Sequence, residues 1–122
     1  MTPMKEDYLK IIFELGGGKK KVSNKDISLG LGIAAGSVTE MIAKLSDEGL
    51  VAHEPYAGIS LTPKGTQLAA ELVRKHRLWE TFLVNKLGYD VADVHPEAVG
   101  LEHRTSDRLA PALGDFLAHP EN

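Results

Sequence analysis

The sequence contains no cysteine, which excludes disulfide bonds, thiolate nucleophiles and cysteine-based zinc sites. It also lacks any run of the roughly 18 to 20 apolar residues that a membrane span requires. The opening stretch, MTPMKEDYLK, carries charges where a secretion signal needs apolar residues, so we expect a cytoplasmic protein with no membrane partner. With 122 residues, 43% of them hydrophobic, the chain is about one domain long, and oligomerisation would help to stabilise it.

The net charge of −3 is distributed unevenly along the chain. Residues 1–79 contain 11 Lys or Arg against 9 Asp or Glu, whereas residues 80–122 contain 3 against 8. A mildly basic first part and an acidic second part fit a phosphate-binding module attached to a region that attracts cations. Charges on helix surfaces can produce the same split by chance, so charge alone leaves both interpretations open.

Capping and breaking residues predict three helices in the first fifty residues. The first covers 2–15, begins with Thr2 as its N-cap and ends at three consecutive glycines. The second, over 23–32, is capped by its leading serine, and the third, over 34–50, ends at Gly49. The apolar residues expected to face the core are Met4, Tyr8, Ile11, Ile12 and Leu15, followed by Val38, Met41, Ile42 and Leu45.

Two short strands, over 50–55 and 58–62, are expected to form a hairpin because Gly58 can adopt the positive φ of a tight turn. Two helices, a short turn and a hairpin form the winged helix-turn-helix arrangement, whose second helix enters the major groove. Small and hydroxylated residues at the start of that helix would allow close approach to the duplex. A helical pair that packs without binding DNA remains the alternative. The residues expected to face bases or backbone are Ala35, Gly36, Ser37, Thr39, Glu40 and Lys44, with Lys25 on the preceding helix.

The remaining residues predict three more helices. The longest covers 62–88, beginning with Thr-Pro and stopping at Gly88. A fifth helix is expected over 93–104 and a sixth over 106–119, where Pro111 should kink the helix or start a new one. The apolar stripe of the long helix consists of Leu68, Leu72, Leu78, Phe82 and Leu83.

Two stretches, HRLWE at 76–80 and HPEAVGLEH at 95–103, gather histidines and glutamates. His76 and Glu80 are one helical turn apart and share a face, and His95 can meet them from the next helix. Nitrogen and oxygen donors of this kind suit a divalent first-row metal, although they can equally form the polar face of solvated helices. A metal-dependent hydrolase is a remote alternative, because no general base is placed and the winged helix would be unexplained.

Five stretches, in this order, resemble the iron- and manganese-dependent repressors typified by the diphtheria toxin repressor and the manganese transport regulator. They are TPMKEDYLKIIFEL, GSVTEMIAKLSDEGLV, EPYAGISLTPKG, LVRKHRLWETFLVNKLG and VHPEAVGLEHRTSD. The resemblance covers nearly the whole chain and implies a mainly α fold. An N-terminal winged helix-turn-helix domain, residues 1–72, is followed by an all-helical metal-binding and dimerisation domain, residues 73–122, which shares the long fourth helix.

The same resemblance implies a transcriptional repressor of metal homeostasis genes, not an enzyme. It would bind a double-stranded DNA operator as a homodimer with Mn²⁺ or Fe²⁺ as corepressor. Matching residues carry over as metal ligands: Asp7, Glu102 and His103 for the primary site, and His76, Glu80 and His95 for the ancillary site.

The chain departs from the family pattern at Val99, where members usually offer Cys or Glu as a further primary ligand. Valine has nothing to donate, so the primary site is expected to be weaker, and a winged-helix regulator that has lost metal control is the main rival. Lys10 stands where manganese-specific members can have Glu, so the second manganese of a paired site is poorly supported. Asp7 replaces a soft sulfur donor of iron-type members and favours manganese.

The sixth predicted helix places apolar side chains along one side, where they would form an exposed patch on a monomer. A symmetric homodimer would cover that patch and would place two recognition helices on two half-sites. The residues expected at the dimer interface are Leu109, Leu113, Phe116 and Leu117.

Overall fold

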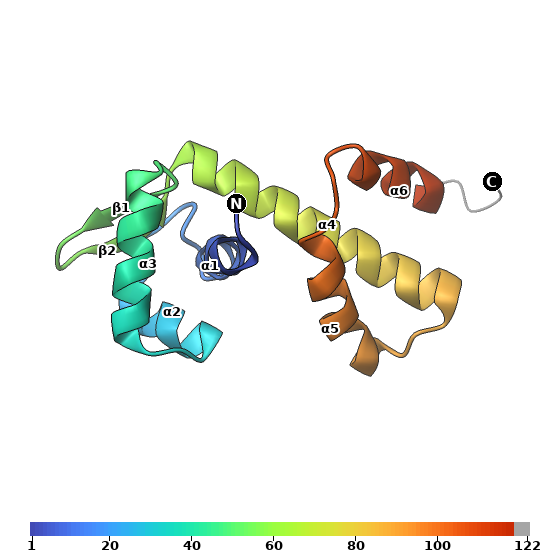
Figure 1. Ribbon diagram of the computed structural model, residues 1–122, viewed down its shortest axis with the longest axis horizontal. Helices are drawn as coiled ribbons and strands as arrows, with labels where there is room; N and C mark the ends of the chain where they lie inside the picture. Colours follow the sequence, from blue (N-terminus) through green and yellow to red (C-terminus); the bar gives the residue numbers. More distant parts are fainter. Residues whose placement is uncertain (119–122) are drawn as a thin grey trace. The chain divides into compact units, whose positions relative to one another are not determined.

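The computed structural model describes residues 1–118 and is mainly α-helical, as the sequence predicts. Each element lies within three residues of its predicted position, and His119, the last residue of the sixth predicted helix, lies outside the described residues. The elements, shown in Figure 1, are α1 (Pro3–Glu14), α2 (Asn24–Leu31), α3 (Ala35–Asp47), β1 (Val51–Glu54), β2 (Gly58–Leu61), α4 (Pro63–Leu87), α5 (Val91–Glu102) and α6 (Leu109–Ala118).

The chain separates into two compact units, Met1–Ala70 and Glu71–Asn122. The division falls inside α4, so this helix contributes residues to both units. The predicted domain boundary, between Leu72 and Val73, lies two residues further along the same helix and stays a prediction.

Helix α1 begins where the sequence predicts. The Thr2 hydroxyl accepts a hydrogen bond from the Lys5 amide at 3.2 Å, and Pro3 occupies the first helical position, where no amide hydrogen is needed. The expectation that Met4 lies in the core is wrong, because this residue is 53% exposed. The first four residues are all exposed, so the buried face begins only with the second turn. That face consists of Tyr8, Leu9 and Ile12.

Helices α2 and α3 form the predicted helix-turn-helix pair and contact each other. The Ser23 hydroxyl caps α2 by accepting from the Asp26 amide at 3.0 Å. Gly32 ends α2 in the left-handed conformation, with φ of 67°, which lets the chain turn into α3 after a few residues. Three of the four predicted apolar positions of α3 are fully buried: Val38, Ile42 and Leu45.

Strands β1 and β2 form an antiparallel hairpin whose register pairs Val51 with Leu61 and Glu54 with Gly58. Gly58 has a φ of 125°, as the turn requires. Val22 adds a third pairing segment that the sequence did not predict. It exchanges two backbone hydrogen bonds with Ile59, at 2.7 and 2.8 Å. Together with α1 to α3, this hairpin completes a winged helix-turn-helix unit (Figure 1).

Helix α4 is 25 residues long and ends at Gly88, whose φ is 74°. Its first turn is capped by the Thr62 hydroxyl, which accepts from the Gly65 amide at 3.1 Å. Gly65 also passes close to the backbone between α3 and β1, because a Cβ at this position would lie 2.0 Å from the Leu50 carbonyl oxygen. Only glycine can therefore occupy this position without moving the backbone.

The second unit contains most of α4 together with α5 and α6. The Ser106 hydroxyl caps α6 by accepting from the Leu109 amide at 3.0 Å. Pro111 is the third residue of α6 and lies in its first turn, where a missing amide hydrogen is tolerated because the amides there have no acceptor within the helix, so it does not kink the helix.

Among the described residues, no single helix combines the length and apolar character needed to cross a membrane. By length and composition alone, only the sharply bent pair of α2 and α3 meets such a test when the two helices are counted together.

Candidate metal and DNA-binding sites

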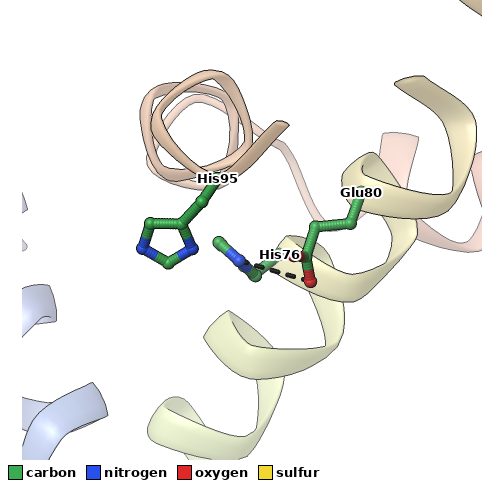
Figure 2. Close-up of side chains that lie close together, drawn as sticks. All are labelled: His76, Glu80 and His95. Atoms are coloured by element: carbon green, nitrogen blue, oxygen red, sulfur yellow. Dashed lines mark ion pairs between the residues drawn. The ribbon is translucent and has the colours of Figure 1, made fainter. Parts of the chain in front are cut away.

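His76, Glu80 and His95 form the cluster that the sequence predicts as an ancillary metal site, and all three belong to the second unit (Figure 2). His76 and Glu80 lie one turn apart on α4, and His95 comes from the first turns of α5. One potential ligand atom from each residue lies within 4.8 Å of the others. His95 is thus brought close to two residues that lie 15 and 19 positions before it in the sequence.

Both ring nitrogens of His76 face a carboxylate. Its Nε2 lies 3.3 Å from Glu80 Oε1, and its Nδ1 lies 2.6 Å from Glu102 Oε1. The His76 ring also meets the His95 ring edge-on, with 4.9 Å between ring centroids. His76 is 7% exposed and Glu102 only 1%, so this hydrogen bond is shielded from water. A protonated Nδ1 donating to Glu102 leaves the Nε2 lone pair directed towards Glu80.

The donor set fits a divalent cation. Two ligands that are each about 2.1 Å from one ion lie roughly 3 to 3.5 Å apart, and the His76 to Glu80 distance falls in that range. Two imidazoles and one carboxylate suit Mn²⁺, Fe²⁺, Co²⁺ or Zn²⁺ better than Ca²⁺ or Mg²⁺, which prefer oxygen donors. A metal-binding imidazole commonly donates its other N–H to a carboxylate, and Glu102 stands in that position towards His76.

The hydrogen bond between His76 and Glu102 was not predicted from the sequence, because the two residues were assigned to different metal sites. Asp7, Glu102 and His103 were predicted as primary ligands. Asp7 is half-buried on α1 of the first unit, whereas His103 is half-buried directly after α5 in the second. Val99, which has no donor atom, is half-buried on α5. The primary-site assignment therefore stays a prediction from the resemblance.

A second polar contact that the sequence did not indicate secures the end of α5. The Trp79 indole N–H donates to the Thr105 hydroxyl at 2.7 Å, and this hydroxyl donates to the Leu101 carbonyl at 2.6 Å. Trp79 lies on α4 between the metal-cluster residues and is the only tryptophan in the chain. The contact ties the segment after Glu102 to the helix that carries His76. No sequence pattern pairs an indole with a threonine 26 residues away.

The seven predicted DNA-contacting residues are all exposed, which leaves them free to meet a duplex. Six lie on α3, and Lys25 lies on α2. Of these seven residues, only Thr39 uses its side chain in hydrogen bonds within the pair formed by α2 and α3. The predicted assignment of these seven residues to DNA contact stays a prediction.

The predicted dimer residues on α6 differ in exposure. Leu109 and Phe116 are 41% and 38% exposed, and Leu117 is half-buried. Leu113 is only 6% exposed within the single chain, so it offers little area to a partner. Phe116 packs against Phe82 of α4, with 6.2 Å between ring centroids. The exposed apolar area on α6 thus comes mainly from Leu109 and Phe116.

Two family models match consecutive parts of the chain. Residues 1–59 match the model of the iron dependent repressor N-terminal DNA binding domain. Residues 62–122 match the model of the iron dependent repressor metal binding and dimerisation domain.

Curated relatives are similar over almost the whole chain. The HTH-type transcriptional regulator MntR of Listeria monocytogenes is 36% identical over 124 residues, which cover 98% of this chain and 87% of the relative. The regulator of the same name from Lysinibacillus sphaericus is 37% identical over a similar extent, 98% and 88%.

Solved structures share the fold. The structure of the manganese regulator SloR has a TM-score of 0.82 and 49% identity, covering 98% of this chain and 56% of that chain. A manganese-dependent transcriptional repressor in complex with manganese has a TM-score of 0.81 and 43% identity, covering 93% of this chain and 52% of that one. The chain thus spans just over half the length of these solved proteins.

Proposed function

Because the chain belongs to the iron-dependent repressor family, we propose that it is a transcriptional repressor that binds operator DNA as a homodimer when a divalent metal is present. Mn²⁺ or Fe²⁺ is the corepressor, and the genes it controls serve metal homeostasis. The family consists of transcriptional repressors, and we assign this chain no catalytic role and a cytoplasmic location, where its DNA target lies.

The observation that carries the metal-dependent part of this proposal is the cluster of His76, Glu80 and His95. A DNA-binding module alone needs no such cluster. Its three donors come from two helices of one unit, and His76 is backed by a buried carboxylate. His76 and His95 would supply nitrogen ligands, Glu80 would supply an oxygen ligand, and Glu102 would orient His76.

Three further residues are proposed as primary ligands on the strength of the resemblance alone: Asp7, Glu102 and His103. Bound metal supplies the free energy that shifts the population towards the DNA-binding conformation, by no more than its difference in affinity for the two conformations. The absence of a donor at Val99 predicts weaker metal binding at this site than in relatives that carry Cys or Glu there.

The winged unit supplies the DNA contacts. Helix α3 enters the major groove, with Ser37, Thr39 and Glu40 towards the bases and Lys44 towards the backbone. Lys25 on α2 binds a neighbouring phosphate, and Ala35 and Gly36 allow close approach. Two such units must lie about 34 Å apart to enter successive grooves, which a homodimer formed through α6 would achieve. The proposed dimer contacts are Leu109, Leu113, Phe116 and Leu117.

Operator binding at buffered free Mn²⁺, Fe²⁺, Co²⁺ and Zn²⁺, with and without chelator, tests the proposal. We expect metal to increase DNA affinity by at least tenfold and chelation to reverse the gain. A chain that binds the same duplex equally well in chelator would instead be a winged-helix regulator without metal control. That second function is favoured by a specific observation, the missing donor at Val99. Calorimetric titration with each metal separates weak binding from none.

A further inference from the structure

Two hydroxylated side chains near the start of α3 differ in what their hydroxyl groups contact. Ser37 is exposed, and its hydroxyl makes no hydrogen bond with any of residues 1–118. Thr39 is also exposed, but its hydroxyl makes two. It accepts from the Asn24 side-chain amide at 3.0 Å and donates to the Ala35 carbonyl at 3.1 Å. Of these two residues, only Ser37 therefore has a hydroxyl proton that is available to DNA.

A threonine hydroxyl has one proton to donate. In Thr39 that proton goes to Ala35, one turn earlier in the same helix. If the Asn24 amide were rotated by 180°, its oxygen would face the hydroxyl and accept the proton instead. In both arrangements the proton stays within the helix pair. Thr39 cannot donate to a phosphate or to a base acceptor without breaking an internal hydrogen bond.

The Asn24 side chain that makes this contact also has one polar atom without a partner. Its Oδ1 is buried and has no hydrogen-bond partner, and it is the only buried side-chain nitrogen or oxygen in that state among the described residues. Burying an unpaired carbonyl oxygen is unfavourable. The first residue of α2 could instead be any good helix former, which would carry no such cost. The contact with Thr39 is the one interaction of this amide that offsets it.

Stereochemistry then decides which part of Thr39 can meet DNA. The three staggered positions on Cβ hold the hydroxyl, the methyl group and a hydrogen. Because Asn24 and Ala35 hold the hydroxyl in one of these positions, the methyl group takes one of the other two, and it is the part of this exposed side chain that is left to contact DNA. In the major groove, the group that a threonine methyl contacts favourably is the C5 methyl of thymine.

We infer that Thr39 meets the operator through its methyl group, against the C5 methyl of a thymine, and that Asn24 is the positioning residue that keeps the hydroxyl turned away. This inference rests on the proposed DNA-binding function and specifies which group of Thr39 faces the bases. It predicts one thymine per half-site whose methyl group, and not its hydrogen-bonding edge, is recognised.

Deoxyuridine tests this directly, because it lacks only the C5 methyl of thymidine. The probe is a duplex selected from a random-sequence library by the full chain with saturating Mn²⁺. Each thymine of one half-site is then replaced singly by deoxyuridine, and affinity is measured by fluorescence anisotropy. We expect one position to lose affinity by roughly threefold to fivefold, the contribution of about one buried methyl group.

Variants at residue 39 show whether the loss of affinity with deoxyuridine depends on the Thr39 methyl group. Thr39→Ser keeps the hydroxyl and its hydrogen bonds but lacks the methyl group, so deoxyuridine at that position should no longer weaken binding. Thr39→Val keeps a methyl group and should retain the sensitivity. Ser37→Ala serves as the matched control, since it should lower overall affinity without changing the ratio between the two duplexes.

The role of Asn24 is tested by the same ratio, that of the affinities for the thymidine and deoxyuridine duplexes. A general loss of affinity lowers both values equally and leaves this ratio unchanged. Asn24→Ala frees the Thr39 side chain to rotate and should reduce the thymine preference. Asn24→Asp can accept the hydroxyl proton and should restore it, even though the added charge weakens binding to all duplexes. If Asn24→Ala does not fold, as judged by circular dichroism, the Thr39→Ser result decides the matter.

Failure of the inference differs from failure of the proposed function. If no duplex is selected with Mn²⁺ and none with Fe²⁺, Co²⁺ or Zn²⁺ in its place, the chain is not a metal-dependent DNA-binding protein, and the inference falls with that function. If a duplex is bound but no deoxyuridine position weakens binding, Thr39 reads no methyl group. Equal deoxyuridine sensitivity in wild type and Thr39→Ser overturns the inference in the same way.

Discussion

Replacing Glu102 by glutamine should weaken metal binding at the cluster of His76, Glu80 and His95, although Glu102 is not itself one of these three residues. Glu102 Oε1 lies 2.6 Å from His76 Nδ1, and the residue is 1% exposed. The carboxylate therefore selects the His76 tautomer whose Nε2 lone pair is available to a cation. Glutamine can still accept the Nδ1 hydrogen, but without charge.

The size of the effect follows from the loss of that charge. A hydrogen bond to a charged group contributes about 1.5 to 3 kcal/mol and a neutral one about 1 kcal/mol. The difference, about 0.5 to 2 kcal/mol, corresponds to roughly a twofold to thirtyfold loss in affinity. This overlaps the lower part of the 10- to 100-fold range typical of residues that orient metal-binding histidines. Glu102→Ala, which removes the acceptor altogether, should approach the upper end.

The measurement must exclude the primary site, to which Glu102 is also assigned. We would therefore titrate Mn²⁺ and Co²⁺ by calorimetry into a background chain carrying Asp7→Ala and His103→Ala, with and without Glu102→Gln. Glu97→Gln is the matched control, because Glu97 is an exposed glutamate on the same helix. Circular dichroism checks that each variant is folded.

Two results would refute this reasoning. One is unchanged affinity in the Glu102→Gln chain. The other is an equal loss in the Glu97→Gln chain, which would indicate a general effect of charge. Adding His76→Ala gives a further check, since without His76 the change at Glu102 should have no additional effect on the cluster.

Three further predictions concern the fold and its assembly. Gly65→Ala should lower the free energy of unfolding by about 2 kcal/mol or more, because a Cβ would lie 2.0 Å from the Leu50 carbonyl oxygen. In contrast, Gly100→Ala should raise the free energy of unfolding by about 0.5 to 1 kcal/mol, because Gly100 is helical and a Cβ there would have no atom within 4 Å. Urea denaturation that finds Gly65→Ala more stable than Gly100→Ala would contradict this packing. Burial raises the pKa of the Tyr8 phenol above 10.0, so its contribution to stability is complete below pH 10 and is lost as the pH rises through the folded-state value. The difference in stability between wild type and Tyr8→Phe should accordingly shrink or reverse between pH 9 and 11 in urea titrations, and a constant difference would argue against it. Leu109→Asp, at an exposed apolar position on α6, should shift the chain from dimer to monomer in light scattering at tens of micromolar protein; an unchanged dimer would place the interface elsewhere.

The helices and strands were predictable because the signals that begin and end them are local. Thr2 and Ser23 cap their helices through hydrogen bonds to residues three positions ahead, and glycines with positive φ end α2 and α4. Such contacts depend on neighbours in the sequence and not on packing. Pro111 was ambiguous, since a proline is tolerated in a first turn and disruptive later, and the capping hydroxyl of Ser106 decided which applied.

The candidate metal cluster was partly predictable for the same reason. His76 and Glu80 share a helix face at a spacing of four residues, whatever the rest of the chain does. That His95 joins them required the family resemblance, because a residue on another helix can be placed only when the packing of the two helices is known.

Signals between neighbouring residues in the sequence were thus sufficient to predict the order of the helices and strands, the wing, and the pair of His76 and Glu80 in the metal cluster. Contacts between helices decided what their side chains do: the Glu102 carboxylate behind His76, the Trp79 indole on Thr105, and the Asn24 amide that occupies the Thr39 hydroxyl. Each joins residues 15 to 26 positions apart, and hydrogen bonds of that range depend on how two helices pack against each other, which no periodicity along the chain encodes.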